Sequence, residues 1–227
     1  MLKNLRLKIK NHSRGITLIE IIVVIFIIIL FSLILIVDFP KNLRQFALKR
    51  VVYKLAQDIK ETEDLSLSGV HISDKNGSPI LLKGYGIYFF DPLSDSTHYL
   101  IYADVNNNQK YEDEPNLHNC GDNLQFTCCD LVDQTLQPLA TDCVLEIVDI
   151  SKENRSLSIE KFVDKENQEI SGTGISINFI PPNPTIKITK DVGEPEELEY
   201  VGIVLKNTDN LTKKVIINIA GLINIEQ

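Results

Sequence analysis

The order of hydrophobic and polar positions divides the chain into three parts. Between Ile16 and Val37, 19 of 22 residues are apolar. A helix of that length would measure roughly 33 Å, enough to cross a hydrocarbon core of about 30 Å. From residue 43 to residue 65, apolar residues recur at steps of three and four, which predicts an amphipathic helix. After Gly69 the pattern changes to short β-rich segments, so we expect an α+β fold in which a long N-terminal membrane-spanning helix packs on a mostly antiparallel β-sheet head.

Nine segments after Gly69 are rich in Ile, Val, Tyr or Phe and are separated by turn signals, which predicts strands. No helical pattern long enough for a parallel crossover lies between them, so antiparallel pairing is favoured. The predicted strands are Ile80–Lys83, Gly86–Phe90, Tyr99–Ala103, Val144–Ile150, Ser156–Val163, Gly174–Phe179, Thr185–Thr189, Tyr200–Lys206 and Lys214–Ile225.

Charge is distributed unevenly along the 227 residues. The net charge is −8, but the first 15 residues contain five basic and no acidic side chains, so the remainder has a net charge of −13. The acidic remainder argues against direct binding of nucleic acid. A basic flank before an apolar run predicts a cytoplasmic N-terminus and an exported C-terminal part, and therefore a single-pass protein of the inner membrane. The expected organisation is a leader (1–15), a transmembrane helix (16–37), an exported amphipathic helix (38–68) and an exported β-rich head (69–227).

Two residues do not fit a generic membrane anchor. Glu20 lies inside the apolar run, where a carboxylate costs a few kcal/mol and usually has a partner. Gly15 separates the basic flank from the apolar run. An interfacial position near the membrane surface is the alternative explanation for Glu20.

The segment Arg14-Gly15-Ile16-Thr17-Leu18-Ile19-Glu20 resembles the cleavage and methylation motif of type IV prepilins and of type II secretion pseudopilins. The resemblance implies that a prepilin peptidase cuts between Gly15 and Ile16 and methylates the new N-terminus at Ile16. The mature chain would then have 212 of the 227 residues. Phe is commoner than Ile at the first mature position of this family.

The same resemblance implies an assembly mechanism, with Thr17, Leu18 and Glu20 as assembly residues. Glu20 of one subunit would pair with the terminal amine of its neighbour, because two charges that are unfavourable alone become tolerable as a pair. The implied partners are the prepilin peptidase, other pilin or pseudopilin subunits, the membrane and the inner-membrane assembly platform. The helix pattern from Leu55 to Leu65 is similar to that of minor pseudopilins and pilus-initiating minor pilins, which implies a pilin-like fold with a periplasmic or extracellular head.

Oxygen-bearing side chains alternate after the strand predicted at Tyr99–Ala103 and resemble the ligand order of a calcium loop. Gln109 occupies the position at which such a loop has Gly, and Pro115 the position of its bidentate acid. The alternative is a solvated acidic turn. The candidate Ca²⁺ ligands are Asp104, Asn106, Asn108, Lys110, Glu112 and Glu114.

Four cysteines follow, and an even number in an exported domain favours disulfides. Because Cys128 and Cys129 are adjacent, we expect them to join different partners, Cys120 and Cys143. A zinc site is the alternative, although the chain has no C-x-x-C pair.

No catalytic motif is present, and His71, His98 and His118 are scattered, so we expect no enzyme. The leading hypothesis is a structural pilin or pseudopilin subunit, more like a minor than a major one. A membrane-anchored module that binds calcium or another ligand without polymerising is the second hypothesis, and a tethered exported enzyme without a recognisable site is the third. Such a subunit could serve a secretion pseudopilus or a pilus for adhesion, motility or DNA uptake.

Overall fold

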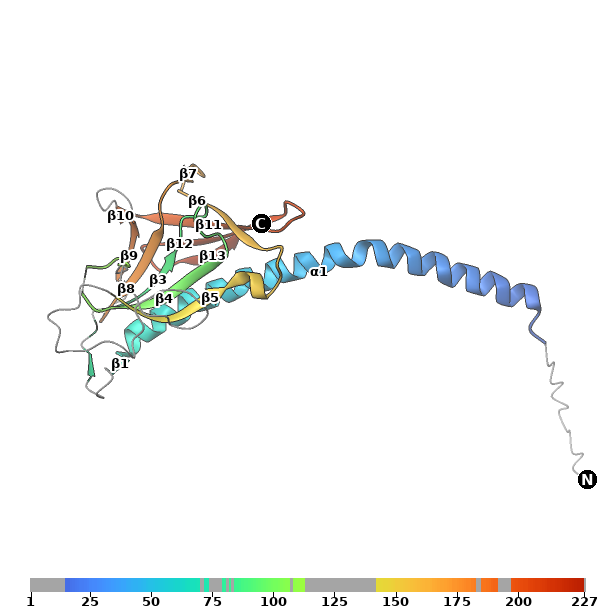
Figure 1. Ribbon diagram of the computed structural model, residues 1–227, viewed down its shortest axis with the longest axis horizontal. Helices are drawn as coiled ribbons and strands as arrows, with labels where there is room; N and C mark the ends of the chain where they lie inside the picture. The colour runs from blue at the N-terminus through green and yellow to red at the C-terminus, as the bar shows by residue number, and fades with distance from the viewer. Residues whose placement is uncertain are drawn as a thin grey trace, which may run out of the picture. The chain divides into compact units, whose positions relative to one another are not determined.

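A computed structural model of the chain (Figure 1) describes residues 15–69, 72–73, 79–80, 82, 84–106, 108–112, 142–182, 185–191 and 197–226. Its long helix, α1, covers Leu18–Ser68 and continues through Pro40. Gly69 follows the helix with φ +61°, the left-handed conformation in which glycine commonly ends helices. A short 3-10 helix, η2, covers Ile150–Lys152.

Antiparallel pairing joins most strands into two sheets. The six-stranded sheet has the order β10-β9-β8-β3-β4-β5, the five-stranded sheet has the order β13-β12-β11-β6-β7, and β1 pairs with β2 separately. The strands are β1 (Ile72–Ser73), β2 (Pro79–Ile80), β3 (Gly84–Phe89), β4 (His98–Asp104), β5 (Cys143–Asp149), β6 (Ser158–Val163), β7 (Glu169–Ile170), β8 (Ile175–Ile180), β9 (Thr185–Lys190), β10 (Glu197–Leu198), β11 (Tyr200–Lys206), β12 (Thr212–Asn218) and β13 (Ile223–Glu226).

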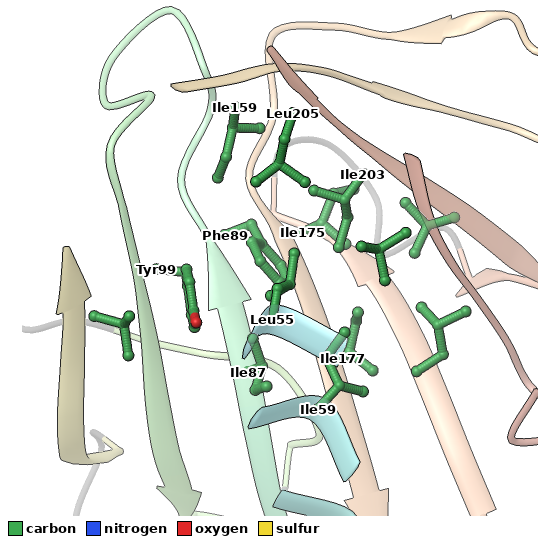
Figure 2. Packing of buried hydrophobic residues seen from close by; sticks show 14 of the residues in the cluster. Leu55, Ile59, Ile87, Phe89, Tyr99, Ile159, Ile175, Ile177, Ile203 and Leu205 are labelled. Carbon is green, nitrogen blue, oxygen red and sulfur yellow. The ribbon is translucent and has the colours of Figure 1, made fainter. Parts of the chain in front are cut away.

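The main core combines the two large sheets with the C-terminal part of α1. Figure 2 shows Leu55 and Ile59 of α1 close to Ile87 and Ile177 of the six-stranded sheet, and the same cluster contains Ile203 of the five-stranded sheet. The buried positions of α1 recur every three or four residues, so they lie on one face of the helix. They are Leu48, Val51, Val52, Leu55 and Ile59.

The expected fold class, an α+β pilin-like fold with a long N-terminal membrane-spanning helix packed on a mostly antiparallel β-sheet head, is wrong. The described chain is mostly β, with eleven strands in two antiparallel sheets, and the buried part of α1 belongs to a core that both sheets share. The sequence pattern identified strands, but strand alternation alone does not reveal which strands form a second sheet.

Within the ranges described above, no helix is long and apolar enough to cross a membrane. This finding contradicts the transmembrane helix expected over residues 16–37. It also contradicts the localisation that depended on that helix, namely a single-pass inner-membrane protein with a cytoplasmic N-terminus and a periplasmic or extracellular head.

Most predicted strands correspond to one strand of the sheets, but the last corresponds to two. The segment predicted as one strand, Lys214–Ile225, is divided into β12 and β13. Gly221, with φ +81°, lies in the turn that joins them, and Ile217 pairs with Ile223 across the hairpin. A glycine in the left-handed region is the local reason for the reversal.

Backbone contacts group the chain into two units, Met1–Asn42 and Leu43–Gln227. The second unit contains both large sheets together with the part of α1 that contributes to their core.

The core predicts the effect of shortening one α1 side chain. Leu55 is 1% exposed, so Leu55→Ala should lower the free energy of unfolding of the second unit by about 2–5 kcal/mol, because it removes buried contacts and leaves a cavity. Chemical denaturation of the full chain measures this. Leu93, which is 87% exposed, gives the control Leu93→Ala, expected within about 0.5 kcal/mol of the parent. Equal, small effects of the two substitutions would contradict the packing of α1 in the core.

Candidate functional site

The predicted cleavage position lies immediately before α1. Gly15, Ile16 and Thr17 precede the first helical residue, Leu18, and all are exposed. Apart from its two chain neighbours, no described residue lies within 4 Å of the position that a Cβ at Gly15 would occupy. The peptide bond between Gly15 and Ile16 is therefore outside the helix and accessible on the Gly15 side, as a protease substrate requires. Residues 1–14 lie outside the described ranges.

Thr17 and Glu20 have a local role at the start of α1. The backbone amide of Glu20 donates to the Thr17 hydroxyl (3.3 Å) and to the Thr17 carbonyl (3.1 Å). A threonine followed three residues later by glutamate is the pattern of a capping box. The hydrogen bond from the Glu20 amide to the Thr17 hydroxyl is one of the two hydrogen bonds of that motif. A carboxylate in the first turn is also favoured by the helix dipole. The spacing of Thr17 and Glu20 thus defines where the helix begins.

The side chain of Glu20 is exposed, as are the apolar side chains that follow it. From Ile16 to Phe31, every large hydrophobic side chain retains between 45% and 79% of its accessible surface. Soluble monomers rarely expose contiguous apolar patches beyond a few hundred Å², and larger ones mark interaction sites. This stretch is therefore the largest candidate interaction surface among the described residues.

The loop after β4 uses its polar side chains to bind its own backbone. The carboxylate of Asp104 accepts from the Gln109 amide (3.2 Å), Asn106 accepts from the Asn108 amide (3.1 Å), and Asn108 accepts from the Lys110 amide (3.1 Å). Gln109 has φ +65°, so it adopts the left-handed conformation for which a calcium loop uses glycine.

The metal site expected in this loop is not formed by the described residues. No group of three or more His, Cys, Asp or Glu side chains there is placed to hold a metal ion. The Lys110 ammonium lies 2.8 Å from Glu112, and that hydrogen bond raises the pKa of Lys110. Asn106 also donates to Glu112 (3.1 Å), so this carboxylate already has two partners. Glu114 lies outside the described residues.

Sequence reasoning missed Asp142, which holds this loop from the other side. Its carboxylate is buried and accepts from the amides of Val105 (3.3 Å) and Glu112 (2.9 Å). Burial is the main cause that raises the pKa of Asp142 to about 8, and the nearby carboxylate of Asp104 raises it further. No local motif marks Asp142, because both of its hydrogen-bonded partners lie at least 30 positions earlier in the chain.

A buried tyrosine extends this polar cluster into the sheet. The Tyr102 hydroxyl accepts from Asn178 (3.4 Å), and Asn178 also donates to Asp104 (3.4 Å). Burial and the charges of Asp142 and Asp104 raise the pKa of Tyr102. Gly86 makes room for the ring, since a Cβ there would lie 2.4 Å from a Tyr102 carbon. The cluster anchors the loop on the sheet.

The described residues contain one of the four cysteines, so the predicted pairing of Cys128 and Cys129 with Cys120 and Cys143 stays a prediction. Cys143, at the start of β5, is the one cysteine described, and it is buried and not a free thiol. Cys120, Cys128 and Cys129 lie outside the described residues, as do His71 and His118.

His98 stabilises the turn before β4. Its Nδ1 lies 2.8 Å from Asp95, and its Nε2 lies 3.8 Å from Asp149 on the adjacent strand. Burial raises the pKa of Asp95, but hydrogen bonds from Thr97 and His98 outweigh it, so the pKa is lowered overall. The Thr97 hydroxyl also lies 3.1 Å from Nδ1, and together these contacts fix the turn.

Comparisons with family models, with curated proteins and with solved structures found no match to this chain.

The pKa of Asp142 predicts a pH dependence of stability. The folded state holds a proton on Asp142 up to about pH 8, whereas the unfolded state loses it near pH 3.8, so stability should fall as pH rises between these values. The slope should be on the order of 1 kcal/mol per pH unit, and Asp142→Asn should flatten it. Melting temperatures of the full chain from pH 5 to pH 8.5 measure both.

Asp64→Asn, at an exposed carboxylate of α1, is the control for loss of one negative charge. If the stability of Asp142→Asn changed with pH as steeply as that of the parent and of Asp64→Asn, this result would contradict a buried, protonated Asp142.

Proposed function

We propose that this chain is a structural subunit of a type IV pilus or a type II secretion pseudopilus, that prepilin peptidase processes it, and that it assembles through the N-terminal part of α1. The observation that carries the proposal is the position of the Gly15–Ile16 bond. It lies just outside a helix whose first residues expose a continuous apolar surface. Cleavage there would release that helix from its basic leader.

Burial of apolar surface supplies the driving force for assembly. Each large apolar side chain that moves from exposure to full burial contributes about 1.5–3 kcal/mol before entropic costs. More than ten such side chains between Ile16 and Phe31 are about half exposed. Other subunits of the same kind, which carry the same apolar helix, are the partners that fit this surface.

Glu20 gives that assembly a defined register. Its carboxylate is exposed in an otherwise apolar surface, and its backbone amide rather than its side chain makes the capping bond to Thr17. Burial of the carboxylate without a partner would be costly, and a terminal amine at Ile16 of a neighbouring subunit would offset that cost. Subunits would therefore associate at the position that pairs these two charges.

The head would decorate or cap the filament. Its carboxylates and the −13 charge of the chain beyond the leader favour solubility rather than direct binding of DNA. The similarity of residues 55–65 to minor pseudopilins favours a minor subunit over a major one.

Processing predicts a specific N-terminus. Co-expression of the full chain with a prepilin peptidase should give a product of 212 residues that begins with N-methyl-Ile16. Intact-mass and N-terminal peptide mass spectrometry measure it. The variant Gly15→Val, which adds a side chain at the scissile bond, should remain full-length. A wild-type product that retains Met1 in the presence of active peptidase would contradict the proposed function.

A further inference from the structure

A pocket lies between α1 and the start of β12, within the unit Leu43–Gln227. Its volume is about 270 Å³, close to the lower end of the range for sites that bind small molecules. Each polar side chain that lines it can donate a hydrogen bond, and none is acidic. The lining residues are Gln45, Leu48 and Lys49 of α1, Leu211 of the turn before β12, and Thr212 and Lys213 of β12.

A bidentate ion pair holds the two walls of this pocket together. The guanidinium of Arg44 on α1 donates to both carboxylate oxygens of Asp209 in the turn, over 2.7 and 2.8 Å. Asn207, at the start of the same turn, accepts from the amides of Asp209 (2.9 Å) and Leu211 (3.0 Å). The turn is therefore ordered and attached to α1 without a ligand, so a ligand would not have to order these walls.

The charges that line the pocket are positive, although the unit around it is acidic. Residues 43–227 contain 17 basic and 29 acidic side chains, a net charge of −12. Lys49 and Lys213 form no ion pair with any residue that the structure describes. The carboxylate of Asp209 is already paired with Arg44. Two like charges that line one pocket without a counter-ion favour an anion there.

We propose that this pocket binds the phosphate group of an organic phosphate. The two ammonium groups supply charge, while the Gln45 amide and the Thr212 hydroxyl supply neutral donors, a set that suits an anion with several acceptor oxygens. Leu48 and Leu211 provide apolar surface for a carbon chain attached to the phosphate. This site goes beyond the proposed function and does not depend on it.

The phosphate can come from a membrane lipid or from a soluble ester, and two probes separate these sources. Dioleoylphosphatidylglycerol is an anionic lipid, and glycerol phosphate is a soluble ester without acyl chains. Native mass spectrometry of the full chain, released from a non-ionic detergent, counts the bound molecules of each probe. We expect a saturable one-to-one adduct with the probe that represents the source.

Substitution of the two lysines assigns that adduct to the pocket. Lys49→Gln and Lys213→Gln should each raise the Kd of the bound probe about tenfold, because each removes one charged donor. Lys49→Arg, which keeps the charge, should retain most of the affinity. Lys165→Gln, at an exposed lysine that does not line the pocket, is the matched control and should bind like the parent.

The outcomes separate the two sources from an absence of the site. Phosphatidylglycerol binding that both glutamine variants weaken would identify a lipid, and glycerol phosphate binding that they weaken would identify a soluble ester. No one-to-one adduct with either probe would overturn the site. An adduct that both glutamine variants form as readily as the parent would also overturn it. Either of these negative results would leave the proposed processing and assembly unaffected.

Discussion

The structure depends on the helix α1, whose C-terminal part packs in the core of the head and whose N-terminal part is exposed. In the C-terminal part of α1, Leu48 to Ile59 belong to the core that the two sheets share. In the N-terminal part, the large apolar side chains from Ile16 to Phe31 are exposed. An exposed apolar stretch of this size is typical of an interaction site. The processing and assembly proposed above would account for both observations.

The head is stabilised by polar contacts that connect distant parts of the chain. Arg44 makes a bidentate contact with Asp209 between β11 and β12, and Arg50 pairs with Glu153 after η2. Asp142 binds the loop after β4 from the start of β5. A buried carboxylate of this kind is costly when ionised, and retention of a proton reduces that cost. The loop is therefore organised by internal hydrogen bonds.

The sequence alone predicted the features that depend on local patterns. The amphipathic stretch from residue 43 to residue 65 lies within α1, and β3, β4, β8 and β11 match predicted strands to within two residues, because hydrophobic periodicity and β-branched content are local signals. The second sheet and the partners of Asp142 were not predicted, because each depends on pairings over long sequence separations. The division at Gly221 is local, and the β-rich pattern on both sides of this glycine concealed it. The predicted transmembrane helix was wrong, because no helix among the described residues is long and apolar enough to cross a membrane. Of the predicted calcium ligands, the described ones bind backbone amides and Lys110 instead.

Glu20 is proposed to set the register in which subunits associate. Incorporation of a Glu20→Ala chain into assemblies tests this role most directly. Co-expressed with prepilin peptidase and unsubstituted copies, this variant should be cleaved normally but excluded from filaments. Ser32→Ala, which removes another polar side chain from the same exposed part of α1, should be incorporated like the parent. Quantitative mass spectrometry of sheared filaments gives the ratio of variant to parent. Incorporation of Glu20→Ala at the parental level would contradict the claim.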